Sequence, residues 1–71
     1  MDYKVSTLRN AGLEARWGKT RNGAPILFAR EPGTRTWWAV DASLWDRMQE
    51  DGIREAFEGA TAAGQFFSVP A

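Results

Sequence analysis

Residues 13–40, LEARWGKTRNGAPILFAREPGTRTWWAV, decide the fold of this 71-residue chain, because they hold three strand-like segments in succession. Leu13–Trp17 alternates apolar and polar residues, as a strand with one buried face does. Pro25–Arg30 has an apolar centre on both faces, and Thr36–Val40 is rich in residues that suit a pleated sheet. The pattern predicts three neighbouring strands.

Two turn signals separate these strands. Asn22-Gly23 is a strong hairpin signal, because both residue types tolerate positive φ. Pro32-Gly33 supplies a proline for the first corner of a turn and a glycine for the second. Short connections of this kind favour a three-stranded antiparallel meander.

A short helix is predicted before the meander. Residues 6–11 have helical character, with Ser6 as a candidate N-cap and Gly12 as the glycine that ends the helix. The alternative places Tyr3, Val5 and Thr7 on one face of a strand. We prefer the helix, because Asn-Ala-Gly is a natural helix stop.

A second, amphipathic helix is predicted after the meander, ending at Gly64. Asp41 and Ser43 are both candidate N-caps, and Ser43 with Asp46 approximates a capping box. The helix is expected to bend or break at Gly52, because glycine is a poor helix former. Residues 66–69 then form an extended tail that folds back over apolar surface.

The predicted fold is therefore a small α+β domain spanning residues 1–71. Its order is α-β-β-β-α, with a three-stranded antiparallel sheet, both helices on one face, and the extended C-terminal tail.

Composition excludes most catalytic chemistry. The chain has no cysteine and no histidine, so cysteine nucleophiles, histidine bases and Cys/His zinc sites are all absent. Carboxylates do recur four residues apart, at Asp46 and Glu50 and at Asp51 and Glu55, and these pairs are typical of a solvated helix face. We expect no enzyme activity, no metal and no cofactor.

The sequence also indicates a compartment and an origin. No apolar run approaches the length of a membrane span, and the N-terminus lacks an apolar signal region, so we expect a cytoplasmic protein. Seven arginines against two lysines suggest a GC-rich bacterial or phage coding sequence.

Three groups of residues are candidates for partner binding. Adjacent strand residues face opposite ways, so Trp38 is expected in the core and Trp37 on the open face beside Arg16. An exposed tryptophan next to an arginine is typical of an interaction hot spot, unless the tail or an oligomer contact covers it. The second group is basic and lies near the turn tips: Lys19, Arg21 and Arg35. The third is an acidic helix face: Asp46, Glu50, Asp51, Glu55 and Glu58.

Charge is divided unevenly between the two ends of the chain. Residues 1–40 carry seven basic and three acidic side chains, a net +4, and residues 41–71 carry two basic and six acidic ones, a net −4. The two parts either attract each other within the fold or leave an acidic face for a basic partner.

The expected element order resembles the double-stranded-RNA-binding fold and the HicA-type toxins built on it. Residues 8–13, LRNAGL, are similar to the opening helix of those toxins, and residues 52–57, GIREAF, to the start of their closing helix. The resemblance places the toxin's catalytic histidine near residues 22–24, where this chain has none, so it implies the fold without RNA cleavage. The basic cluster of RNA-binding members is replaced here by Asp46, Glu50 and Asp51.

We therefore expect a small, non-catalytic inhibitor or adaptor that binds a protein, such as a basic nucleic-acid-binding surface. Phages and mobile elements encode such proteins against host or defence complexes, anti-CRISPR proteins among them. One alternative is a nucleic-acid-binding module that uses the sheet face and the basic loops. Another is an assembly component that forms a homo-oligomer through the open sheet face.

Overall fold

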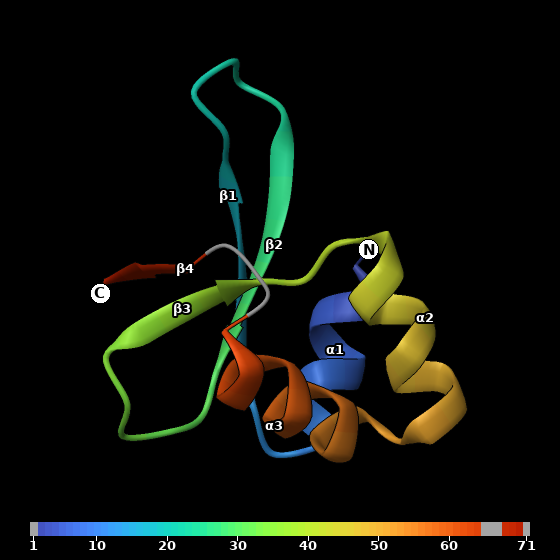
Figure 1. Ribbon diagram of the computed structural model, residues 1–71. Helices are drawn as coiled ribbons and strands as arrows, with labels where there is room; N and C mark the ends of the chain where they lie inside the picture. The colour runs from blue at the N-terminus through green and yellow to red at the C-terminus, as the bar shows by residue number, and fades with distance from the viewer. Residues whose placement is uncertain (1, 65–67, 71) are drawn as a thin grey trace.

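The computed structural model describes residues 2–64 and 68–70 (Figure 1). In chain order the elements are α1 (Tyr3–Asn10), β1 (Glu14–Lys19), β2 (Pro25–Arg30), β3 (Thr36–Ala39), α2 (Ala42–Asp51), α3 (Ile53–Ala63) and β4 (Ser68–Pro70). The strands form one antiparallel sheet in the order β1-β2-β3-β4. The α+β class is confirmed, while the three-stranded sheet is wrong because part of the expected tail pairs with β3.

The β1–β2 hairpin projects beyond the rest of the molecule (Figure 1). Its strands pair from Glu14↔Arg30 to Lys19↔Pro25, and the amide of Thr20 donates to the carbonyl of Ala24 across the loop. Both predicted turns are present, and in each of them the glycine takes a positive φ while its neighbour does not.

Helix α1 begins earlier than the sequence predicts. Asp2 is its N-cap, and the Asp2 carboxylate accepts hydrogen bonds from the amides of Lys4 and Val5. Ser6 lies within the helix, so its assignment as N-cap is wrong, as is the strand alternative for this segment. A side-chain oxygen one turn earlier competes for the free amides, and it sets the start of the helix.

The second helix is broken in two, as Gly52 predicted. Gly52 has φ 98° and ψ 143°, a conformation that only glycine adopts readily, and it separates α2 from α3. The Asp41 carboxylate caps α2 by accepting from the amide of Leu44 at 2.8 Å, so the capping box at Ser43 does not form. Gly64 ends α3 in the left-handed conformation, as expected.

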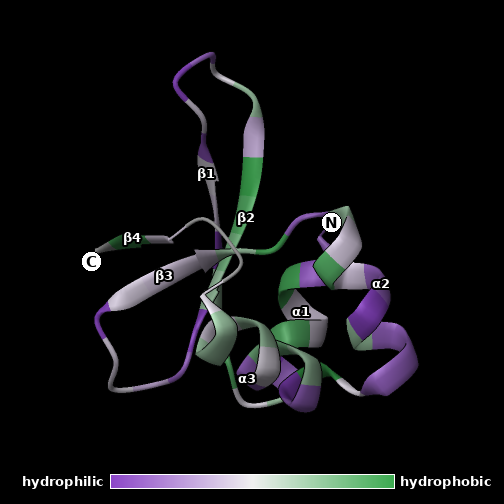
Figure 2. Ribbon diagram, viewed as in Figure 1, coloured by the Kyte–Doolittle hydropathy of each residue, from purple (hydrophilic) through white to green (hydrophobic). Residues whose placement is uncertain are grey.

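All three helices pack against one face of the sheet, and the main core lies between the helices and this face. The largest fully buried side chains there are Leu8, Leu44, Met48 and Phe57. The buried residues of all three helices are apolar. The outer end of α2 is hydrophilic (Figure 2). The prediction that the helices share one face is confirmed.

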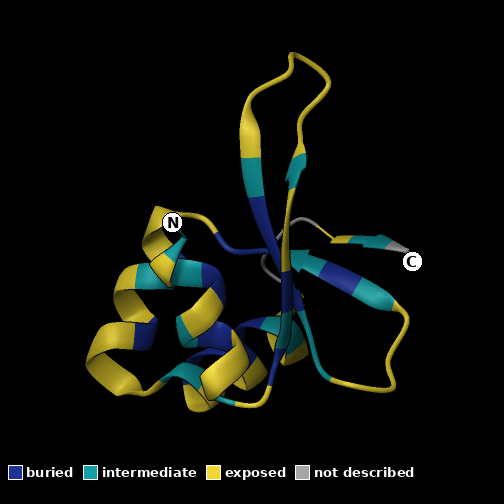
Figure 3. Ribbon diagram, turned by 180° about the vertical axis from the view of Figure 1, so that it is seen from behind, coloured by how far each residue is buried: buried dark blue, intermediate teal, exposed yellow. Residues whose placement is uncertain are grey.

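A second, smaller cluster lies on the opposite face, which we call the open face. Phe28, Trp37 and Ala39 are buried there, and Ile26 and Val69 pack against them. The buried centre of β2 and β3 and the exposed tip of the hairpin are visible in Figure 3. No helix within residues 2–64 and 68–70 is long and apolar enough to cross a membrane.

Candidate functional site

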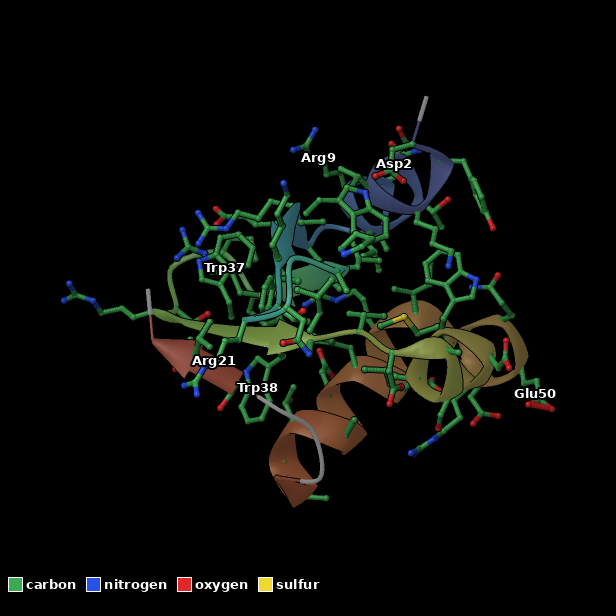
Figure 4. All side chains as sticks on the ribbon, turned by 90° about the horizontal axis from the view of Figure 1, so that it is seen from above. Asp2, Arg9, Arg21, Trp37, Trp38 and Glu50 are labelled. Atoms are coloured by element: carbon green, nitrogen blue, oxygen red, sulfur yellow. The ribbon has the colours of Figure 1, made fainter. Side chains whose placement is uncertain are left out.

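The fold separates the sequence-predicted binding residues into two groups. The open face and the loops beside it carry the tryptophan and the basic residues: Arg16, Lys19, Arg21, Arg35 and Trp37. The helices carry the acidic residues. In Figure 4, Glu50 lies at the far end of the molecule from both Trp37 and Arg21.

Trp37 faces the open side of the sheet, as strand alternation predicts, but it is not exposed. Only 6% of its surface is accessible. The guanidinium carbons of Arg16 and Arg30 lie 4.4 and 4.3 Å from its ring centroid, within the range of a cation–π interaction. Trp37 also pairs with Val69 of β4. The expectation that Trp37 is exposed is therefore wrong, and the alternative that other residues cover it holds.

The covering of Trp37 follows from the register of the strands. Because Ala29 pairs with Trp38, Arg30 lies opposite Trp37 on the open face. Its side chain also donates to the Glu14 carboxylate at 2.6 Å. The expected cover by residues 66 and 67 lies outside the described residues. Arg30 was not among the predicted binding residues, although its position two residues after Phe28 places it on the same face of β2.

A groove of about 590 Å³ lies on the open face beside the Phe28 cluster. Most of the surface that lines the groove is apolar, and its apolar residues are Ile26, Phe28, Ala39 and Val69. Its polar residues are Lys19, Thr20, Arg21 and Asp41. Volume and lining are both in the range of sites that hold a small ligand or an anchoring side chain. The groove brings together residues from all four strands and from the hairpin loop, which explains why local sequence patterns did not predict it.

Gly18 lets the Phe28 ring approach the backbone of β1 closely at this groove. A Cβ atom added at Gly18 would lie 2.9 Å from a ring carbon of Phe28, closer than side chains normally approach. The backbone φ of Gly18 is not in the left-handed region, so close packing rather than conformation requires glycine here.

Lys19 and Arg21 are exposed and form the basic rim of the groove. Within residues 2–64 and 68–70 neither has an ion-pair partner. The groove's acidic residue, Asp41, already accepts a hydrogen bond at the start of α2. Arg35 is exposed in the β2–β3 loop, outside the groove.

The acidic residues are all exposed, but they do not form one helical face. Asp46, Glu50 and Asp51 are on α2, whereas Glu55 and Glu58 are on α3. The predicted pairing of Asp51 with Glu55 along one helix is wrong, because the chain breaks between them.

Arg54 neutralises part of this acidic surface. It lies 2.6 Å from the Glu31 carboxylate and 3.4 Å from that of Glu58. Its guanidinium also donates to the carbonyl of Ala11, so it ties α3 to the ends of α1 and β2.

The sequence analysis also missed an aromatic patch on the helices. Tyr3 is 62% exposed, and its ring meets that of Trp45 edge-on at 6.0 Å. The ammonium of Lys4 lies 5.2 Å from the Trp45 ring centroid. The sequence shows Tyr3 at the start of one helix and Trp45 on another. Their contact depends on how α1 packs against α2, which the sequence pattern does not reveal.

In the described part of the chain, no three acidic side chains gather closely enough to hold a metal ion. Comparisons with protein-family models, with curated proteins and with solved structures found no match for this chain.

Proposed function

We propose that this protein is a non-catalytic binding module that acts as an inhibitor or adaptor by contacting another protein through its open face. The observation that carries the proposal is the apolar groove between the hairpin loop and β4. It combines apolar walls with a charged rim, the composition that anchors an inserted side chain at a protein interface.

On the open face, the covered aromatic rings favour a protein over a nucleic acid as the partner. Proteins that bind single strands stack successive bases on exposed aromatic faces. Phe28 and Trp37 are only 8% and 6% accessible, so neither offers such a face. Arg16, Lys19 and Arg21 support the alternative of a nucleic-acid-binding module, because basic side chains on one face attract phosphates.

The acidic helices supply a second surface suited to an adaptor. Their exposed carboxylates favour a basic protein surface, such as one that binds nucleic acid. Tyr3 and Trp45 place two aromatic rings on the same helical layer. An origin in a phage or mobile element, with a defence complex as an anti-CRISPR-like target, remains a proposal from composition and size.

The proposal is tested by tagged pull-down from a bacterial lysate, with and without nuclease, read by mass spectrometry. Four forms are compared: the wild type, Ile26→Gln in the groove, Glu50→Lys/Glu55→Lys on the helices, and Trp17→Gln as a matched control. Trp17 is 44% exposed on the same hairpin but does not line the groove.

A partner that survives nuclease, is lost with Ile26→Gln and is kept with Trp17→Gln supports the proposal. If nuclease treatment abolishes capture of the partner, the result favours the alternative, a nucleic-acid-binding module. Loss with Glu50→Lys/Glu55→Lys while Ile26→Gln still binds would place the contact on the helices instead.

A further inference from the structure

We propose that the open-face groove binds a protein segment that carries a bulky apolar side chain next to carboxylates. This inference rests on the proposed function and deepens it by naming the chemistry of the partner. Three features of the groove lead to it: its walls, its charge and its position on the sheet.

The walls select an apolar side chain. Ile26 and Val69 are half-buried and line the groove together with the buried Phe28 and Ala39. These four residues come from three strands, and their positions are fixed by the pairing of β2 with β3 and of β3 with β4. Transfer of an apolar side chain from water to such walls is favourable in proportion to the apolar area buried.

The rim selects negative charge beside that apolar group. Lys19 and Arg21 lie at the hairpin end of the groove and have no ion-pair partner among the described residues. Arg16 lies opposite Phe28 on the neighbouring strand, so a third cation borders the same face. The lining also contains one acid, Asp41, which accepts a hydrogen bond from the amide of Leu44 and keeps its negative charge. Two cations against this one anion still give the groove a net positive charge.

The position of the groove favours side-chain recognition over the addition of a strand to the sheet. The groove lies over the face of the sheet and not along its edge. At the β1 edge, the Arg9 guanidinium already donates to the carbonyl of Ala15 at 3.1 Å. A partner strand at the β1 edge would have to displace this bond, whereas a side chain entering the groove displaces no hydrogen bond found among residues 2–64 and 68–70.

The test uses three synthetic six-residue peptides with blocked ends. The first has a leucine-phenylalanine centre flanked by two acidic residues on each side, the second replaces the acids by lysines, and the third replaces the apolar centre by serines. Each is titrated into the whole isotope-labelled chain and followed by two-dimensional amide NMR. We expect the acidic apolar peptide alone to shift the amides of Ile26, Phe28, Ala39 and Val69.

A pair of double variants isolates the role of charge. Lys19→Gln/Arg21→Gln removes the rim cations, and we expect it to weaken binding of the acidic peptide about fivefold to tenfold, since exposed ion pairs are individually weak. Arg35→Gln/Arg47→Gln removes the same charge from two exposed sites outside the groove, and binding should be unchanged. Amide spectra of both variants report whether the fold is kept.

Several results would overturn the inference. These are equal or tighter binding of the lysine peptide, equal loss in the two double variants, and groove shifts that grow with protein concentration alone, which indicate a second copy. Displacement of the acidic peptide by an oligothymidine would assign the groove to nucleic acid. If the pull-down gives a partner that depends on Ile26 while the peptides show no preference for acids, the proposed function stands and this inference alone fails.

Discussion

Replacement of Gly18 by alanine tests whether the open face is as closely packed as its geometry indicates. The new Cβ would lie 2.9 and 3.2 Å from two carbons of the Phe28 ring. Ordinary carbon contacts lie at about 3.5–4.0 Å, so the ring must move by roughly half an ångström. Phe28 is buried against Trp37 and Ala39, and the displacement therefore spreads into the cluster.

The expected change in stability is the sum of two opposing terms. Overpacking of this kind costs about 1–3 kcal/mol. Alanine in place of glycine within a strand returns about 0.5–1 kcal/mol, because the unfolded chain loses conformational freedom. The free energy of unfolding should therefore fall by about 0–2.5 kcal/mol, with a central value of about 1.3 kcal/mol. At about 4–8 °C per kcal/mol for a domain of this size, the central value lowers Tm by about 5–10 °C, measured by thermal and urea denaturation.

Gly59→Ala is the matched control. Gly59 lies inside α3 with ordinary helical φ, and an added Cβ would meet nothing within 4 Å. Stability should rise by about 1 kcal/mol, since glycine is a poor helix former.

The substitution Phe28→Leu in the Gly18→Ala background should recover part of the loss, because the shorter side chain makes room for the new methyl group. The two changes are then coupled in a double-mutant cycle. A Gly18→Ala protein as stable as Gly59→Ala, or additive behaviour with Phe28→Leu, would refute the close contact.

Three further substitutions test the break between α2 and α3, the N-cap of α2, and the contacts that Arg54 makes from α3. Gly52→Ala should lower stability by about 1–3 kcal/mol, because φ of 98° is strained for alanine; an unchanged urea midpoint would show that the chain relaxes there. Asp41→Ala should cost about 0.5–2 kcal/mol through loss of the hydrogen bond from Leu44, and Asp41→Asn much less, as measured by thermal melting. Arg54→Gln should cost at most about 1 kcal/mol, and the difference should disappear at high salt because its pair with Glu31 is partly exposed.

Local patterns predicted the elements wherever a signal covered several residues. The three strands of the meander, their two turns, and the helix break at Gly52 were all expected from alternation and from glycine chemistry. The start of α1 was not predicted correctly, because Asp2 and Ser6 are both good N-cap residues and their sequence context does not decide between them. Strand β4 was missed because three residues are too few to show a period.

For the candidate site, the sequence predicted the correct face of the sheet for Trp37 but not its burial. Alternation along β3 correctly placed Trp37 on the face away from the helices. Its burial depends on Arg16 and Arg30 reaching over the ring from two other strands, and that requires the pairing register. The groove likewise depends on where Val69 returns to the sheet, which no local pattern encodes.

The separation of charge between the open face and the helices bears on how a partner arrives. The chain has no formal net charge, so it exerts little pull on a distant molecule. Near the surface, each face projects its own field over about 8 Å at physiological ionic strength, while the molecule measures 31 × 28 × 24 Å. An approaching protein therefore interacts with the positive or the negative face, but not with both, and this interaction orients the protein before contact. Encounters would be selected by orientation, and low salt would speed the productive approach of an acidic partner while slowing a basic one that meets the same side.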